Sequence, residues 1–168
     1  MTPTPDSGRI QPAEARRCSA QTLSPKPAEA RPPLPAPVAR TRERIVAAAT
    51  ACDYEALAAI GREGGTELKF TLGPGTDAAV FWRELERNGT PVLARLVKVL
   101  DHPAFLLGDE YVWPSAMREG ATDRDWTALE GLYPPEELAA MKREGLGYTG
   151  IRVGIRVDGA WRLALAGD

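Results

Sequence analysis

The last twenty residues alternate apolar and polar side chains around a tight turn, and no other stretch of the chain restricts the fold as strongly. They read TGIRVGIRVDGAWRLALAGD, with Asp158-Gly159 near the centre. Alternation with a period of two is typical of a strand that buries one face, and Asp-Gly is a common turn between strands. The sequence therefore predicts a C-terminal β-hairpin with one apolar face on the core.

The length of the hairpin loop decides which side chains share a face. A two-residue loop would place Ile155 opposite Arg162 and would mix apolar with charged groups. A three-residue loop with Gly159 in the left-handed conformation pairs Ile155 with Trp161 instead, and all large apolar residues then share one face. The predicted pairs are Ile155–Trp161, Val153–Leu163 and Ile151–Leu165. We predict that Trp161 is buried.

The opposite face of the hairpin is polar. It is expected to present Arg152, Gly154, Arg156 and Arg162, with Ala160 and Ala164 between them. Exposed charged residues are the ordinary outcome for such a face. Glycine weakens a strand, however, so Gly154 indicates a bend or the close approach of a ring or a ligand, and Tyr148 is a candidate ring. A solvated face and a ligand-binding face both stay open.

The preceding residues combine helical and strand-like patterns. We expect helices within 38–52, 53–62, 77–88, 91–103 and, in two pieces, 123–145, with strands at 67–73 and 108–114. Asp53 and Asp77 are good N-caps for two of these helices. The fold class predicted is α+β, with helices packed on a small antiparallel sheet that the C-terminal hairpin closes.

The first 37 residues differ in composition from the rest. They hold nine of the fifteen prolines and no aromatic residue, so they cannot bury enough apolar surface to offset the entropy of ordering. We predict a disordered Pro-rich tail over residues 1–37 and a single α+β domain over residues 38–168. The tail serves as a spacer or as a polyproline ligand for a partner.

Charge and hydropathy exclude some classes of protein. A formal net charge of -2 gives no electrostatic reason to expect nucleic acid as a partner. The sequence contains no run of about eighteen apolar residues, so we expect no transmembrane segment. The first twenty residues contain no apolar stretch of the kind that an export signal requires, which favours a cytoplasmic protein or one whose leader was lost.

Two cysteines and one histidine are too few for most metal and disulfide frameworks. Cys18 and Cys52 can form at most one bridge, and the sequence leaves open whether they do. His102 has no companion at metal-ligand spacing, so we expect neither a metal site nor a cofactor. His102 is expected at the C-terminal end of a helix, where it would cap the helix beside the negative end of the helix dipole.

Three motifs together resemble an uncharacterised bacterial family. They are GDEYVWP (108–114), YPPEEL (133–138) and the ending GYTGIRVGIRVDGAWRLALAGD (147–168), within a match over about residues 40–168. Members of that family often carry exported or lipoprotein leaders, so the resemblance implies a role in the cell envelope or periplasm. The chain departs from a lipid-attachment pattern, because Ala15-Arg16-Arg17 precedes Cys18.

The order of elements also resembles the nuclear-transport-factor-2-like domains, in which a curved sheet wraps a long helix. Those domains include isomerases, dehydratases and pure binding modules, so the likeness does not select a function.

Three functions fit the sequence. The first is a non-catalytic binding or interaction module for an unknown small molecule or protein, with an oligomeric state that the sequence does not constrain. Its binding residues are expected among Tyr111, Trp113, Tyr148, Arg152, Arg156 and Trp161. The second is a small acid/base isomerase, dehydratase or hydrolase with a pocket near Asp109 and Tyr111, assisted by Glu110 and His102. The third is a structural protein that presents its Pro-rich tail to a partner.

Overall fold

Six α-helices and four strands make up the part of the chain that the computed structural model describes, which is residues 17–24, 33–65, 67–73, 77–145 and 147–166. The helices are α2 (Ala36–Thr50), α3 (Tyr54–Arg62), α4 (Ala78–Arg87), α5 (Val92–Leu100), α6 (Asp123–Thr127) and α7 (Pro135–Arg143), with a 3-10 turn η1 (Ser115–Met117). The strands are β1 (Phe105–Leu107), β2 (Glu110–Trp113), β3 (Arg152–Arg156) and β4 (Trp161–Leu165). The α+β class is confirmed.

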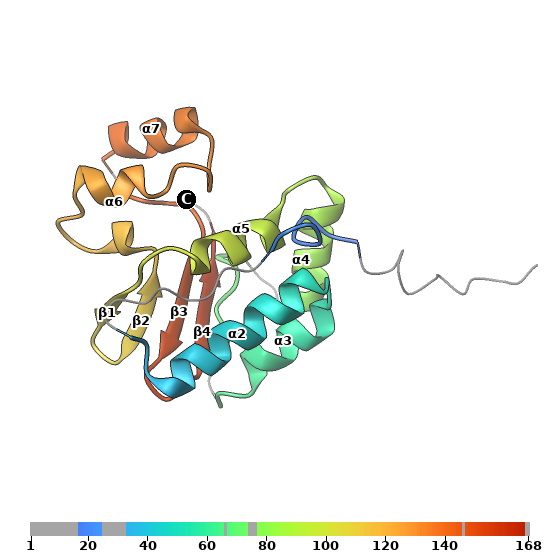
Figure 1. Cartoon of the computed structure of the whole chain (residues 1–168). Coiled ribbons are helices and arrows are strands. Elements are labelled where there is room, and N and C mark those ends of the chain that lie inside the picture. Colours follow the sequence, from blue (N-terminus) through green and yellow to red (C-terminus); the bar gives the residue numbers. More distant parts are fainter. Residues whose placement is uncertain (1–16, 25–32, 66, 74–76, 146, 167–168) are drawn as a thin grey trace, which may run out of the picture.

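The helices gather on one side of a single sheet. α2 and α5 lie against each other and against β3, and α3 and α4 complete the helical layer (Figure 1). α6 and α7 form a small lobe of their own at one end of the strands (Figure 1). The main core therefore lies between the sheet and the α2–α5 group.

The strands follow one another as β1-β2-β3-β4, and every neighbouring pair is antiparallel. The loop between β3 and β4 has the predicted three-residue form. The Arg156 N–H donates to the Ala160 carbonyl at 2.9 Å, and Gly159 is left-handed with a φ of 94°. Ile155 pairs with Trp161 as predicted.

Beyond Trp161 the predicted hairpin register is wrong. β4 contains a bulge with Arg162 as the additional residue, so neither the Val153–Leu163 nor the Ile151–Leu165 pair forms. The observed pairs are Arg152–Leu165, Val153–Ala164, Gly154–Leu163 and Ile155–Trp161. The small Ala164, rather than Leu163, therefore shares the helix-covered face with Val153.

The bulge coincides with a contact from a distant segment. The Lys69 N–H donates to the Arg162 carbonyl at 2.9 Å, and the Ala164 N–H donates to the Lys69 carbonyl at 3.0 Å. Lys69 thus pairs in parallel with the outer side of β4. Hairpin periodicity alone contains no information about this third partner, which is why it predicted an uninterrupted register.

The segment 67–73 is not the full strand that its alternation predicted. Only Lys69 forms a bridge, although Leu68 and Phe70 are buried on the expected face. Leu72 leaves that face and is 61% exposed. The segment pairs with β4 only at the bulge, so the alternating sequence pattern covers more residues than the backbone pairing does.

Trp161 is buried in the main core, as predicted. Its side chain is 1% exposed and stacks on Trp82 of α4, with ring centroids 5.8 Å apart and an interplanar angle of 14°. The indole Nε1–H donates to the Leu163 carbonyl at 2.9 Å, so its polar atom is satisfied. The indole therefore connects the hairpin to the helical layer.

A buried arginine ties α2 to the end of α5. Arg42 is almost completely buried, and its Nε–H donates to the Leu100 carbonyl at 2.9 Å. Its guanidinium also pairs with Asp101 at 3.2 Å. A cation at the carbonyl end of a helix interacts favourably with the helix dipole, so this contact fixes how α2 and α5 meet.

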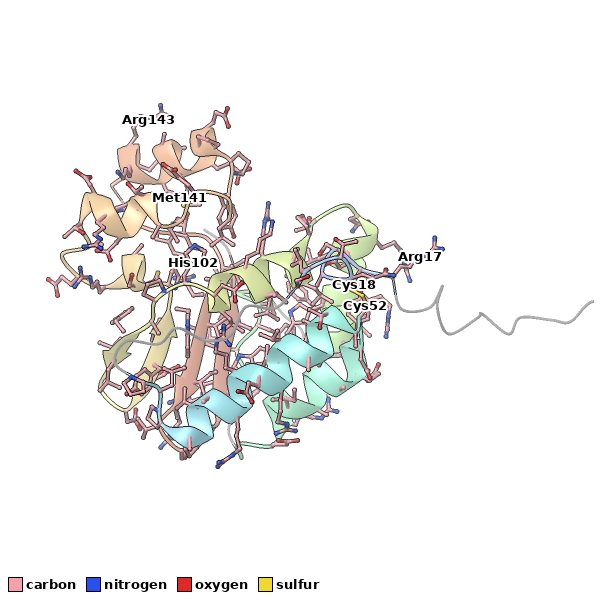
Figure 2. All side chains as sticks on the ribbon, viewed as in Figure 1. Arg17, Cys18, Cys52, His102, Met141 and Arg143 are labelled. Atoms are coloured by element: carbon pink, nitrogen blue, oxygen red, sulfur yellow. A yellow bond between two sulfur atoms is a disulfide. The ribbon has the colours of Figure 1, made fainter. Side chains whose placement is uncertain are left out.

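Residues 17–24 do not behave as part of the expected disordered tail. Cys18 forms a disulfide with Cys52, with Cα atoms 5.6 Å apart, and Ala20 is completely buried (Figure 2). Residues 1–16 and 25–32 lie outside the described residues. Composition alone predicted disorder for these eight residues because they have little apolar surface of their own. One disulfide and a few contacts hold them against the domain instead.

Cys52 follows the end of α2 and does not lie on its apolar face. The Cys52 N–H donates to the Ala49 carbonyl and the Asp53 N–H to the Ala48 carbonyl, both at 3.0 Å. These two bonds form a Schellman motif, whose C′ residue is left-handed, and Cys52 has a φ of 54°. Asp53 then caps α3, as predicted, by accepting from the Ala56 N–H.

A carboxylate near the start of α6 ties this helix to the η1 turn. Asp125 accepts hydrogen bonds from the Thr122 backbone N–H at 2.7 Å and from Ser115 Oγ at 3.0 Å, and it pairs with Arg118 at 2.8 Å. Burial raises the pKa of this carboxyl. The hydrogen bonds from Arg118, Thr122 and Ser115 outweigh burial and lower the pKa of Asp125 to about 2.

This depressed pKa predicts a stability contribution that acid removes. The ionised carboxylate stabilises the fold above its ordinary pKa of 3.8, and the contribution is lost as the pH falls from about 4 to about 2. Because water screens this surface site, we expect Asp125→Asn to lower the free energy of unfolding by only about 1 kcal/mol at pH 7. Urea unfolding measured at several pH values checks this, with the fully exposed Asp123→Asn as control. A loss of equal size at neutral and acidic pH would contradict the assignment.

Candidate binding surface at the open edge of the sheet

The two edges of the sheet differ. The outer side of β4 is covered by Lys69, whereas β1 is the last strand on the other side and pairs with no further strand among the described residues. β1 has the sequence FLL, and its Leu106 and Leu107 are 53% and 63% exposed. An unpaired strand edge with exposed leucines is a surface that most soluble proteins avoid.

The hairpin geometry shows which backbone groups of β1 point outward. β1 and β2 are joined by the two residues Gly108 and Asp109, and Gly108 has a φ of 64°, as a type II′ turn requires at its first position. Leu107 and Glu110 flank this turn and form a hydrogen-bonded pair, so Leu106 falls at the alternate position. The N–H and C=O of Leu106 therefore point away from β2.

A second turn lies beside the β1–β2 turn. The Val157 N–H donates to the Asp109 carbonyl at 2.8 Å, which joins the β3–β4 loop to the β1–β2 turn. Val157 is 39% exposed. Leu106, Leu107 and Val157 are three of the five large hydrophobic residues that the described part of the chain exposes. We call these three residues and the two turns the hairpin corner.

Charged groups surround the hairpin corner. Arg156 pairs with Asp109 at 3.2 Å and with Asp158 at 3.8 Å, and it lies opposite Glu110 in the sheet register. The Nε atoms of Arg156 and Arg152 are buried and donate no hydrogen bond to any described residue. Leu106 and Leu107 point to opposite faces of the sheet, and the charged Glu110 and Arg156 share the face of Leu107.

The group that approaches Gly154 is a carboxylate and not a ring. A Cβ placed on Gly154 would overlap the carboxylate of Glu110, which lies over the glycine from the neighbouring strand. Tyr148 instead packs beside Gly150, where a Cβ would lie 2.5 Å from the Tyr148 hydroxyl. Gly154 was expected to admit a ring or a ligand, but the neighbour is Glu110 of β2, because the neighbouring strand is not revealed by a single hairpin.

Three of the six predicted binding residues belong to the core. Trp113, Tyr148 and Trp161 are almost completely buried, so they present no ring to a ligand at the surface. The Tyr148 hydroxyl donates to the Ile151 carbonyl, and the Ile151 N–H donates to the Tyr133 hydroxyl, each at 2.8 Å. Burial raises the pKa of Tyr148 far above its ordinary value, so this hydroxyl stays protonated.

The other three predicted residues lie on β2 and β3. Tyr111 is half-buried on β2, between Leu106 of β1 and Ile155 of β3. Arg152 and Arg156 are half-buried at the two ends of β3. The structure therefore brings Tyr111 and Arg156 close to the hairpin corner and places Arg152 at the far end of its strand.

His102 lies apart from Asp109, Glu110 and Tyr111, the other residues proposed for acid/base chemistry. Both ring nitrogens of His102 lie on backbone carbonyls, Nδ1 at 2.8 Å from Lys98 and Nε2 at 2.5 Å from Ala128, which is a capping position (Figure 2). Asp109 and Glu110 lie at the opposite end of the β1–β2 hairpin, about 10 Å or more away at the rise of a strand. His102 therefore has no ring nitrogen to offer a substrate held near Asp109.

The exposure of at least one of these two leucines could have been predicted from the sequence. Consecutive residues of a strand point to opposite faces, so Leu106 and Leu107 cannot both face the core in the segment AFLLGDE. The Gly-Asp turn that follows them is a signal for a hairpin whose first strand contains this pair. The pattern was missed because the strand was expected to begin only at residue 108.

No family model, curated protein or solved structure matches the chain. None of the helices within the described residues is long and apolar enough to cross a membrane.

Proposed function

We propose that this protein is a non-catalytic interaction domain that binds an extended peptide segment of a partner protein along β1. The observation that carries the proposal is the edge of β1, which pairs with no further strand within the described residues and has Leu106 and Leu107 exposed beside it. In strand addition, main-chain hydrogen bonds hold the added segment, and pockets or apolar contacts for alternate side chains provide specificity.

The size of the edge sets the expected affinity. β1 spans three residues, so its backbone offers a single outward position, and the leucine side chains have to supply most of the binding free energy. Full burial of one leucine contributes about 1.5–3 kcal/mol, and part of this gain is offset by the loss of freedom on binding. We expect a weak and transient complex, with a Kd on the order of micromolar or weaker.

The compartment forms the second part of the proposal. A disulfide between Cys18 and Cys52 supports a location in an oxidising compartment, because reducing systems keep thiols free in the cytosol. The motifs that resemble an exported bacterial family support the cell envelope as that compartment. Alkylation of free thiols in freshly lysed cells tests this part, since a reduced pair would take up two labels and a bridged pair none.

A peptide selection tests the binding function. We expect the full chain to enrich peptides with alternating apolar residues from a random extended-peptide library, and we expect the Leu106→Lys/Leu107→Lys variant to lose them. Leu72→Lys is the matched control, because Leu72 is equally exposed but lies away from β1. All three proteins should melt alike, since exposed substitutions change stability by about 0.5 kcal/mol or less.

The same selection can reject the proposal. Enrichment that survives in the Leu106→Lys/Leu107→Lys variant would place binding elsewhere on the molecule. Hydrogen exchange gives an independent measure, because an added strand has to protect the Leu106 amide, whose N–H points away from β2.

A further inference from the structure

A second candidate site lies on the other side of the molecule from the hairpin corner, under the disulfide-linked segment 17–24. A hollow of about 940 Å³ opens between this segment, the start of α3 and the end of α4. Its lining includes Arg17, Arg83 and Arg87, together with Tyr54 and Glu86. We call it the arginine groove.

The three arginines come from two separate parts of the chain. Arg83 and Arg87 are four residues apart on α4, so they lie on the same face of that helix. Arg17 is adjacent to Cys18, and the bridge to Cys52 holds it at the rim of the groove (Figure 2). The fold therefore collects three guanidinium groups that local sequence does not place together.

The one carboxylate among the described residues that line the groove is already engaged. Glu86 accepts from the Ser19 N–H at 3.0 Å and from the Ser19 hydroxyl at 2.5 Å, and it accepts from the Leu93 N–H at 2.8 Å. The Ser19 hydroxyl oxygen in turn accepts from the Ala94 N–H at 2.9 Å. Glu86 and Ser19 thus satisfy the first turn of α5, and Glu86 is not directed at the arginines.

The arginines differ in how they are held. Arg83 lies over the Tyr54 ring at 5.1 Å from its centroid and pairs with the exposed Glu55 at 3.6 Å. Arg17 and Arg87 form no ion pair with any described residue. Like charges four residues apart on a helix lower its stability by a few tenths of a kcal/mol. A contribution to the stability of α4 therefore does not explain why Arg83 and Arg87 occur at this spacing.

Tyr54 adds a hydrogen-bond donor next to these cations. Burial and the nearby Glu86 raise the pKa of Tyr54, while Arg83 and Arg87 lower it less. Its hydroxyl therefore stays protonated at neutral pH and sits in the field of both arginines. The disulfide and Pro91 supply apolar wall beside it.

We infer that the arginine groove binds a small organic molecule through its carboxylate or phosphate group, with Arg17 and Arg87 as direct ligands of the oxyanion. A guanidinium presents a planar fork of donors that matches the oxygens of either group. Arg83, stacked on Tyr54, provides fixed positive charge behind them, and the apolar wall accommodates the carbon body of the ligand. This site is independent of the strand-addition surface.

Titration calorimetry with two probes, succinate and inorganic phosphate, tests the inference on the full oxidised chain. We expect saturable binding of at least one probe, and the probe that binds more tightly tells a carboxylate source from a phosphate source. Arg17→Gln and Arg87→Gln should each weaken that binding about tenfold, as the loss of a charge-assisted hydrogen-bonding partner does. Arg143→Gln is the matched control, because it removes the same charge from α7 at a distance from the groove (Figure 2).

Two results would overturn the inference. The first is the absence of saturable binding of both probes at millimolar concentration. The second is an equal loss of binding in the Arg143→Gln control, which would show that only the total charge matters. Circular dichroism melts of the variants confirm folding, since Arg17, Arg87 and Arg143 are all exposed.

Discussion

Replacing Trp161 with alanine is expected to lower the free energy of unfolding by about 3–5 kcal/mol. The side chain is 1% exposed, and its ring stacks on Trp82 while its Nε1–H donates to the Leu163 carbonyl. The substitution removes the apolar contact, opens a cavity between the hairpin and α4, and leaves the Leu163 carbonyl without its indole donor. A domain of ordinary stability would lose a large fraction of its total in this way.

Chemical denaturation of wild type and Trp161→Ala gives this number directly. Val157→Ala, in the same hairpin but exposed, is the control and should change the free energy of unfolding by about 0.5 kcal/mol or less. A loss below about 1 kcal/mol for Trp161→Ala would mean that the ring does not fill the core and that the hairpin register differs from the one described.

Removing the disulfide is expected to have a comparable effect. Cys18 and Cys52 are separated by 34 positions, and closing a loop of that length restricts the unfolded chain by about 3–4 kcal/mol. Cys18→Ser should therefore lower the free energy of unfolding by about that amount. The comparison of oxidised and dithiothreitol-reduced wild type in the same denaturant series measures the same quantity without a substitution.

The loss of the disulfide should also be visible locally. Segment 17–24 supplies the Ser19 hydroxyl that accepts from the Ala94 N–H, so the amide of Ala94 should exchange with solvent faster when the segment is released. Gln21→Ala, an exposed change in the same segment, should leave this exchange rate unaltered. Oxidised and reduced proteins that unfold at the same denaturant concentration would show that the bridge does not constrain the chain.

The elements that the sequence predicted correctly are those that depend on near neighbours. Asp53 and Asp77 accept from backbone N–H groups three residues ahead, at Ala56 and Val80, as N-caps do. Gly159 is left-handed because a three-residue hairpin loop requires that backbone conformation at its last residue. Helix faces and hairpin alternation belong to the same class of short-range information.

The candidate sites show the limit of such information. Arg17 and Arg87 are seventy positions apart, and nothing in their local sequence relates them. The carboxylate over Gly154 comes from β2, forty-four positions earlier, so a prediction made within one hairpin assigned the wrong neighbour. Three of the four aromatic residues that were expected to bind a ligand, Trp113, Tyr148 and Trp161, are buried because the core needs their surface.

The sequence by itself determined the α+β class, the C-terminal hairpin with its three-residue loop, and the capped starts of α3 and α4, because periodicity and turn chemistry act over a few residues. Only the tertiary structure decided the bulge at Arg162, the bridge between Cys18 and Cys52, and the exposure of both Leu106 and Leu107 rather than one of them. Each of these depends on which distant segments pack together. Which segments pack together depends on how side chains from the whole core fit one another, and no single stretch of the chain determines this.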